Sequence, residues 1–310
     1  MRIVFFGTPS FSVPFLEALI DDKAIEIVGV VTQPSKPVGR KKELVPSAVK
    51  VIAKEHGLPV FEFERIKSKE ALETITNLHA DLFVVVAYGK IIPISLLDLP
   101  KFGAVNVHPS LLPKYRGPSP RQSAILHGDM ESGVTIIKLD REMDHGPILA
   151  QFAFPLDSRE TMQTLEGKIF HAGPKLLVAT IHALENGTLT PREQNHAEAI
   201  ICSMLTREDG IIDWKKSSEE IDRMYRAFYP WPGVSCLWNR FGKPLSLKIH
   251  ELRPSELSIP AGSVRSIEGK LYIGSSTTAL EILSVQPESK SKMSAKDFLN
   301  GYPDFLETTL

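Results

Sequence analysis

The first 187 residues alternate between short apolar runs and amphipathic segments. Continuous apolar runs at 3–6, 25–31 and 81–87 are typical of strands that are buried on both faces of a parallel sheet. Residues 68–79 show helical spacing of apolar positions, with Ser68 as a suitable N-cap. This alternation predicts an α/β domain with a Rossmann-like, open parallel sheet covered by helices on both faces. Only Gly7 stands where a dinucleotide fingerprint needs three glycines, so NAD binding is not expected.

The pattern changes in the second half of the chain. Residues 161–186 have the apolar spacing of one long helix, and residues 188–208 show little periodicity. Five short strands separated by Gly-containing and polar turns are predicted at 234–238, 245–252, 262–267, 270–274 and 279–285. Such strands predict a small OB-like β-barrel. We therefore expect a Rossmann-like catalytic domain at 1–187, a linker at 188–208 and a C-terminal β-barrel domain at 209–310.

The segment 103–117 offers the clearest candidate chemistry. A short strand at 104–107 places Asn106 and His108 on one face, because alternate strand residues share a face. The proline-containing stretch after them cannot continue as a central strand. Ligands bind at the carboxyl ends of parallel strands, so Gly7, Tyr88 with Gly89, and His108 are expected on the same rim. An ordinary buried strand with hydrogen-bonded Asn and His side chains fits the same spacing.

Two other loops supply charged groups. Asp140 and Asp144 follow a predicted strand at 134–139, and both are candidates for an acid, although a loop aspartate is often only an exposed turn residue. The stretch 33–42 is basic and contains prolines. It is longer than the usual strand-to-helix connection of about 2–6 residues. Such a loop is either functional or simply solvated.

Composition limits the classes of function. The chain has 310 residues, 43% of them hydrophobic, and a net charge of −1, which favours two globular domains over a protein that wraps a polyanion. A local basic patch on a neutral protein can still bind phosphates. Cys202 and Cys236 lack metal-ligand spacing, which argues against a zinc site or a disulfide framework. With no signal sequence and no membrane-length apolar run, a cytoplasmic protein without a membrane partner is expected.

Several motifs carry a resemblance to a known family. The sequence Asn106-Val-His108-Pro-Ser-Leu-Leu-Pro113, with Asp144 further along, resembles the signature of the folate-dependent formyltransferases. Four more motifs extend the resemblance over nearly the whole chain and narrow it to the branch that formylates Met-tRNA. They are Phe6-Gly-Thr-Pro-Ser-Phe11, Thr32-Gln33-Pro34, Val86-Ala-Tyr88-Gly89 and Arg226-Ala-Phe-Tyr-Pro-Trp-Pro-Gly233.

The resemblance implies that a formyl group passes from 10-formyltetrahydrofolate, as cosubstrate, to the α-amino group of methionine on initiator Met-tRNA, without a metal ion. Asn106 and His108 are then the donors that stabilise the oxyanion, and Asp144 moves protons. The implied folate-binding residues are Ser110, Leu111, Leu112, Pro113, Val86, Tyr88, Gly89 and Ile91. The basic residues Arg40, Lys41 and Lys42 match the family's inserted loop, which enters the acceptor end of the tRNA.

Two other functions are compatible with parts of the sequence. Another folate-dependent enzyme, which formylates a purine precursor or an amino sugar or hydrolyses the donor, shares the Asn106 and His108 motif. A catalytically silent RNA-binding protein could use the basic loop and the barrel, although it has no need of a rim His and Asp. The chain also departs from the family pattern, because residues 202–205 lack the usual linker lysine and His145 stands beside Asp144 where a small residue is common.

Overall fold

The computed structural model describes residues 1–38 and 43–310, which fold into two compact units. The first unit contains residues 1–120, 131–155 and 165–202. The second unit contains residues 121–130, 156–164 and 203–310. Residues 188–202, in the predicted linker, are thus part of the first unit, while two short segments that precede the linker in sequence belong to the second.

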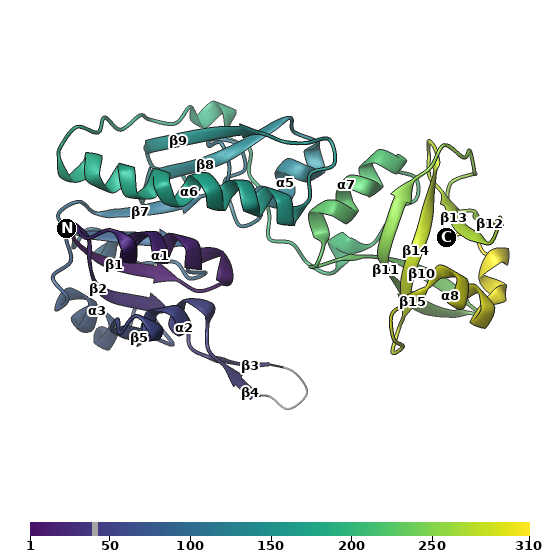
Figure 1. Ribbon diagram of the computed structural model, residues 1–310, viewed down its shortest axis with the longest axis horizontal. Coiled ribbons are helices and arrows are strands. Elements are labelled where there is room, and N and C mark those ends of the chain that lie inside the picture. The colour runs from purple at the N-terminus through teal and green to yellow at the C-terminus, as the bar shows by residue number, and fades with distance from the viewer. Residues whose placement is uncertain (39–42) are drawn as a thin grey trace. The chain divides into compact units, whose positions relative to one another are not determined.

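The first unit is built on a seven-stranded sheet with the strand order β5-β2-β1-β6-β7-β8-β9 (Figure 1). The strands are β1 (Arg2–Gly7), β2 (Glu26–Thr32), β5 (Val60–Glu62), β6 (Leu82–Val86), β7 (Ala104–His108), β8 (Glu131–Lys138) and β9 (Ile148–Pro155). The predicted parallel arrangement is confirmed for the five strands from β5 to β7. The last two strands, β8 and β9, are antiparallel instead. Only a short loop joins them, and a short loop suits antiparallel neighbours, whereas parallel neighbours need a long crossover.

Helices cover both faces of this sheet, as its unbroken apolar strands predict. The helices α1 (Val13–Asp21) and α6 (Met162–Glu185) lie together on one face, where the rings of Phe11 and Phe170 are 5.3 Å apart. On the opposite face, α3 (Lys69–Thr76) and α4 (Ile94–Leu97) pack onto a core that contains Phe6 and Phe83. The predicted cap of α3 is present, because Ser68 Oγ accepts a hydrogen bond from Ala71 N at 3.2 Å.

The basic stretch that we expected to be a loop contains a two-stranded hairpin. Its strands are β3 (Lys36–Val38) and β4 (Glu43–Val45), and helix α2 (Ala48–Glu55) follows. The strands are only three residues long, one of them contains Pro37, and all of β4 is exposed, so the hydrophobic pattern gives no sign of them. The predicted tRNA-binding residues Arg40, Lys41 and Lys42 lie outside the described residues.

The second unit contains a curled, half-barrel antiparallel sheet with the order β10-β11-β14-β13-β12, and β15 pairs with β14. Its elements are α7 (Ser218–Phe228), β10 (Val234–Arg240), β11 (Lys243–Pro254), β12 (Val264–Ile267), β13 (Lys270–Gly274), β14 (Ala279–Pro287), β15 (Met293–Ser294) and α8 (Ala295–Gly301). All five predicted strands are present, and Ser294 caps α8 as expected. Most of α5 (Pro120–His127) also belongs to this unit.

Four short 3-10 helices complete the fold: η1 (Ser10–Ser12), η2 (His196–Glu198), η3 (Glu208–Gly210) and η4 (Pro303–Glu307). Within the described residues, every helix is too short or too polar to cross a lipid bilayer.

Candidate active site

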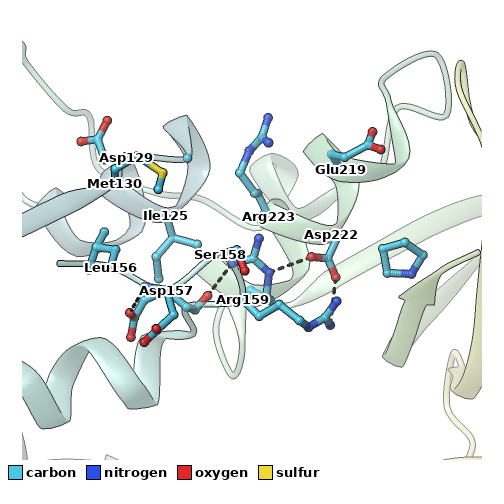
Figure 2. A pocket seen from close by; sticks show the side chains of 14 residues that line it. Ile125, Asp129, Met130, Leu156, Asp157, Ser158, Arg159, Glu219, Asp222 and Arg223 are labelled. Carbon is cyan, nitrogen blue, oxygen red and sulfur yellow. Dashed lines mark hydrogen bonds and ion pairs between the residues drawn. The ribbon is translucent and has the colours of Figure 1, made fainter.

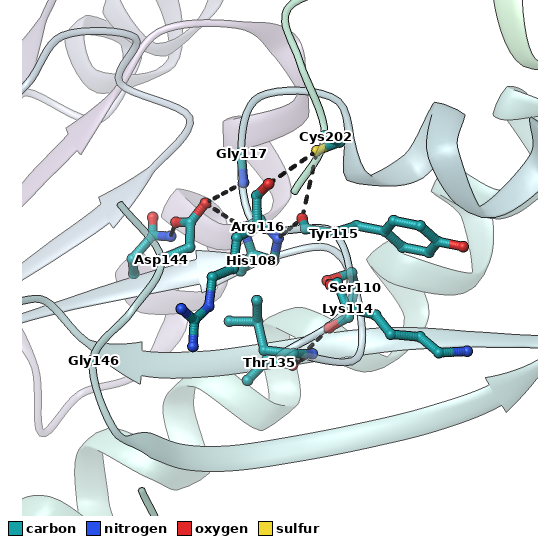
Figure 3. Close-up of polar contacts among 12 residues, drawn as sticks. His108, Ser110, Lys114, Tyr115, Arg116, Gly117, Thr135, Asp144, Gly146 and Cys202 are labelled. Atoms are coloured by element: carbon teal, nitrogen blue, oxygen red, sulfur yellow. Dashed lines mark hydrogen bonds and ion pairs between the residues drawn. The ribbon is translucent and has the colours of Figure 1, made fainter. Parts of the chain in front are cut away.

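Strand β7 and the loop between β8 and β9 bring the three predicted catalytic side chains together. Figure 3 shows His108 and Asp144. Asn106 Nδ2 lies 3.5 Å from Asp144 Oδ1, and His108 Nδ1 lies 3.5 Å from Asp144 Oδ2. The side chains of His108 and Asp144 are 4% and 12% exposed. A carboxylate, an imidazole and an amide thus face one another in a place that is largely shielded from solvent. The alternation predicted from the strand is confirmed.

The orientation of His108 follows from its backbone partner. Its Nε2 lies 2.9 Å from the carbonyl oxygen of Tyr115. A carbonyl oxygen can only accept, so Nε2 carries a hydrogen in this arrangement. The other ring nitrogen, Nδ1, faces Asp144 and is the one available to exchange a proton. Its separation from the carboxylate is long for a hydrogen bond, as is common before substrate tightens a site.

Asp144 is held in an uncommon backbone conformation. Its φ angle is 51°, in the left-handed region that few residues other than glycine adopt. Its Oδ2 accepts a hydrogen bond from the backbone N–H of Gly117 at 2.8 Å. That N–H and His108 therefore approach the same carboxylate oxygen. The conformation of this loop, which sequence spacing cannot give, decides where the carboxyl group points.

The second candidate acid, Asp140, is engaged elsewhere. Its Oδ2 lies 2.7 Å from Nδ1 of His145. The ring of His145 stacks on His196, with a centroid separation of 4.0 Å and planes 1° apart. Of the two aspartates that sequence left open, Asp144 is the one that faces His108. His145 is neither a free surface side chain nor a contact of the Asp144 carboxylate.

A buried side chain of β8 and a half-buried side chain of β9 fix the predicted folate-binding segment. Thr135 Oγ1 donates to the carbonyl of Ser110 at 2.6 Å and accepts from Leu112 N at 3.2 Å. Gln151 Nε2 donates to the carbonyl of Leu112 at 3.0 Å. Of the remaining predicted residues, Leu111 and Pro113 are half-buried. No sequence motif marked Thr135 or Gln151, because each follows the ordinary alternation of a strand.

The other predicted folate-binding segment contributes mostly backbone to the rim. The ring of Tyr88 is buried against Phe6 at a centroid distance of 5.5 Å. Burial raises the pKa of the Tyr88 hydroxyl to about 12, and that hydroxyl has no hydrogen-bond partner within residues 1–38 and 43–310. Val86 is fully buried, whereas Gly89 and Ile91 are exposed. The side chains of Val86 and Tyr88 therefore belong to the core.

Comparison with known proteins gives the family. The formyl transferase profile matches residues 1–181, and that of the formyl transferase C-terminal domain matches residues 204–303. The methionyl-tRNA formyltransferase of Roseiflexus castenholzii is 42% identical over 302 residues, which cover 97% of this chain and 96% of that protein. The methionyl-tRNA formyltransferase of Halalkalibacterium halodurans is also 42% identical, over 97% of this chain and 95% of its own.

The chain belongs to the methionyl-tRNA formyltransferase family. The resemblance inferred from the motifs is confirmed, and the protein is an enzyme, as predicted. An N-formyltransferase from Helicobacter canadensis, solved with folinic acid and dTDP-3-aminofucose, shares its fold, with a TM-score of 0.65 and 20% identity over 94% of this chain and 100% of that one. HypX from Aquifex aeolicus, solved with tetrahydrofolic acid, has a TM-score of 0.63 and 17% identity over 100% of this chain and 48% of its own.

The second unit contains a charged cavity of about 360 Å³ (Figure 2). Its wall includes a buried ion pair, in which Arg226 Nε lies 2.7 Å from Asp222 Oδ2. Arg226 also donates to the carbonyl oxygen of Glu160, and Arg159 lies 3.6 Å from Asp222 Oδ1. The residues that line it are Ile125, Gly128, Asp129, Met130, Leu156, Asp157, Ser158, Arg159, Glu160, Glu219, Asp222, Arg223, Arg226 and Pro254. Each carboxylate oxygen of Asp222 thus has an arginine partner in the wall.

Among the described residues, no group of three or more His, Cys, Asp or Glu side chains is arranged to hold a metal ion.

Proposed function

We propose that this enzyme transfers the formyl group of 10-formyltetrahydrofolate to the α-amino group of methionine on initiator tRNA. Full-length similarity to methionyl-tRNA formyltransferases supports the reaction. The observation that carries the mechanism is the convergence of Asn106, His108 and Asp144 within 3.5 Å contacts. HypX, which shares the fold, was solved with tetrahydrofolic acid, a product of the proposed transfer.

The proposed reaction begins with attack of the methionine amine on the formyl carbon. A carbon–nitrogen bond forms and the carbonyl electron pair moves to oxygen. Asn106 Nδ2–H and the Nδ1–H of His108 in its imidazolium form, which carries a hydrogen on both ring nitrogens, are the donors that stabilise this oxyanion. One such donor contributes about 2.7–4 kcal/mol. His108 can present Nδ1 because Tyr115 O already occupies its Nε2.

Proton movement completes the transfer. Asp144 accepts the proton that the attacking amine loses, since its carboxylate faces the same side as Nδ1 of His108. The proton then reaches the folate nitrogen through His108 or water as the bond between that nitrogen and the formyl carbon breaks. The products are formylated methionine on the tRNA and tetrahydrofolate.

Folate is assigned to the rim beside these residues. Residues 110–113 supply a loop whose backbone Thr135 and Gln151 fix, and the backbone around Gly89 supplies the facing wall. The φ angle of Gly89 is 78°, which exposes peptide groups without a side chain. The pterin ring is expected to use these peptide groups rather than the buried Tyr88 ring.

The basic residues that lie outside the described part of the chain are assigned to the tRNA. Phosphate contacts by Arg40, Lys41 and Lys42 would make tRNA affinity fall as salt rises. Arg40→Ala combined with Lys41→Ala is expected to raise the KM for tRNA and to leave the KM for folate unchanged. Steady-state kinetics at two salt concentrations measure both constants. A defect confined to folate would contradict this assignment.

The acceptor is tested by formyl transfer from 10-formyltetrahydrofolate to charged initiator tRNA, with elongator Met-tRNA and no acceptor in parallel. Transfer to the initiator alone is expected. Loss of the formyl group without acceptor would instead identify a hydrolase, and no consumption of donor would refute the proposal. His108→Ala should abolish transfer, whereas His56→Ala, at the exposed end of α2, is the matched control that should not.

A further inference from the structure

The segment after α6 returns to the catalytic rim. Arg192 exchanges two backbone hydrogen bonds of 2.8 Å with Ile148 at the start of β9. Further along, Cys202 N donates to Arg116 O, and Arg116 N donates to Ile200 O, at 2.8 Å each. Between these two attachments, Gln194 is only 4% exposed. A polar side chain this deeply buried needs partners, and its partners lie at the active site.

The amide nitrogen and the amide oxygen of Gln194 bind different groups. Its Nε2 donates to the carbonyl of Asp144 at 2.9 Å and to the carbonyl of Gly146 at 2.7 Å. Its Oε1 accepts from Nε of Arg116 at 3.1 Å and from Nη2 at 2.8 Å. Only this orientation of the amide is satisfied, because the reverse one would place oxygen against two carbonyls and NH₂ against a guanidinium.

The nitrogen of the Gln194 amide binds the loop that carries and orients the carboxylate of Asp144. Asp144 has a positive φ angle, a strained conformation that persists only when the surrounding structure holds it. Gly117 N–H holds the Asp144 side chain, and the Gln194 amide holds the backbone on both sides of His145. Arg116 is itself buried, and its guanidinium also contacts His196 Nδ1 at 2.8 Å. The group that binds the oxygen of the Gln194 amide is therefore itself held in place.

We propose that Gln194 is a positioning residue for the reaction, which holds the backbone at 144–146 so that the Asp144 carboxylate faces Nδ1 of His108. This inference rests on the proposed function, because it takes Asp144 to be catalytic. Gln194 touches neither substrate in this scheme. Gln194 acts through the peptide groups of the loop at 144–146. A small misplacement of a catalytic group can lower the rate by as much as about 100-fold.

Gln194→Glu separates this role from simple packing. Glutamate keeps the size of the side chain and can still accept from Arg116, but its carboxylate cannot donate to the two carbonyls. We expect kcat to fall about 10- to 100-fold, with the KM for folate and for tRNA each within about twofold of wild type. Gln194→Met, which lacks both donors without adding a charge, is the second variant. Thermal unfolding of each variant reports whether the fold is kept.

Asn195→Asp is the matched control. It makes the same amide-to-carboxylate change one residue along the chain, at an exposed side chain whose Oδ1 still caps Ala197 N. Wild-type kcat is expected for it. The deciding measurement is the double variant: in an Asp144→Ala background, Gln194→Glu should cause no further loss of residual turnover, since its effect passes through Asp144.

The outcomes distinguish the two proposals. Full activity of Asp144→Ala would overturn the proposed catalytic scheme. Loss of activity in Asp144→Ala together with wild-type kcat in Gln194→Glu and Gln194→Met would overturn only the positioning role. A change in KM alone, or equal losses in both backgrounds, would also overturn it, because either result describes a contribution that does not pass through Asp144.

Discussion

The rim around His108 and the aromatic core around Trp238 are stabilised in opposite ways. At the rim, loops are fixed by single hydrogen bonds to backbone groups, such as Gly117 N to Asp144 and Thr135 Oγ1 to Ser110. In the second unit, the ring of Trp238 packs edge-on against Phe305 at 4.9 Å and against Phe298 at 6.3 Å. Hydrogen bonds have direction, whereas apolar packing mainly has volume.

The two regions should therefore respond differently to substitution. Removing one donor or acceptor at the rim misplaces a reacting group while most of the buried apolar surface stays in place. Removing one ring from the aromatic core leaves a cavity and costs stability, but it removes no reacting group. Activity and stability are thus expected to separate between the two regions, which the following substitutions test from the largest effect to the smallest.

Asp144→Asn should have the largest effect, on activity alone. The variant keeps the size of the side chain but cannot accept the amine proton, so kcat should fall about 10²- to 10⁴-fold. Single-turnover formyl transfer measures the chemical step, and thermal unfolding should differ little from wild type. Asp140→Asn is the control, because the carboxylate of Asp140 contacts His145 rather than His108. A similar loss in both variants would contradict the distinction between the two aspartates.

Trp238→Ala should have the largest effect on stability. Truncation of a buried Trp typically costs about 3–5 kcal/mol, and this ring is 1% exposed. Urea unfolding followed by circular dichroism measures the change. Leu237→Ala, on the same strand but 54% exposed, should cost far less. We assign folate binding to the first unit, so the Trp238 variant should still bind folate in conditions where it stays folded. Loss of folate binding in those conditions would contradict the separation of activity and stability between the two regions.

Thr135→Val tests both properties at once. The change keeps the shape of the side chain but leaves the carbonyl of Ser110 and the N–H of Leu112 without this partner. An unsatisfied buried group costs about 1–3 kcal/mol, and the KM for folate should rise because the loop loses its anchor. Thr180→Val is the control, since its hydroxyl bonds only to Leu176 O one helical turn back. An unchanged KM for folate in Thr135→Val would contradict a role of the loop at 110–113 in folate binding.

Tyr88→Phe should have the smallest effect near neutral pH, and the effect should grow in the same direction at high pH. Near neutral pH the variant loses only a buried hydroxyl without a hydrogen-bond partner in the described part of the chain, so stability should be unchanged or higher by up to about 1 kcal/mol. Burial raises the folded-state pKa of Tyr88 from 10.0 to about 12. Ionisation therefore leaves the stability of the wild type unchanged below pH 10 and lowers it as pH rises from 10 towards 12.

Unfolding curves of both proteins from neutral pH to about pH 12 check this prediction. Wild type should lose stability relative to the phenylalanine variant only above about pH 10. A higher KM for folate in Tyr88→Phe would contradict the assignment of this residue to the core.

The sequence predicted those structural features that depend on residues close to one another in the chain. Unbroken apolar runs located the parallel strands, Ser68 located a helix start, and strand alternation placed Asn106 and His108 on one face. The direction of β8 and β9 was not predicted, because apolar runs do not encode whether a neighbour is parallel. The β3–β4 hairpin was not predicted either, since its strands are short and carry no alternating pattern.

The rest of the candidate site depends on contacts between distant segments. The choice between Asp140 and Asp144 rests on a positive φ angle and on the N–H of Gly117, which is 27 residues away in sequence from Asp144. Gln194 stands in a stretch with little periodicity, and 50 residues separate it from the carbonyl of Asp144 that it binds. The side chain of Tyr88 was expected near folate because its motif marks the rim, yet the motif does not tell which way the ring turns.

The attachment of residues 188–202 to the first unit has a consequence for protein engineering. A chimaera that joins this catalytic unit to a foreign acceptor-recognition module would conventionally be cut at the end of the long helix, near Gly187. Such a cut would discard Gln194 and the strand-like pairing of Ile201 with Arg116. The last segment of the first unit ends at Cys202, so a junction after Cys202 keeps both of these contacts. Gly117 adds a restriction, because any other residue there would bring Cβ to 2.2 Å from Cys202 O, so the loop and the tail must be transplanted as a pair.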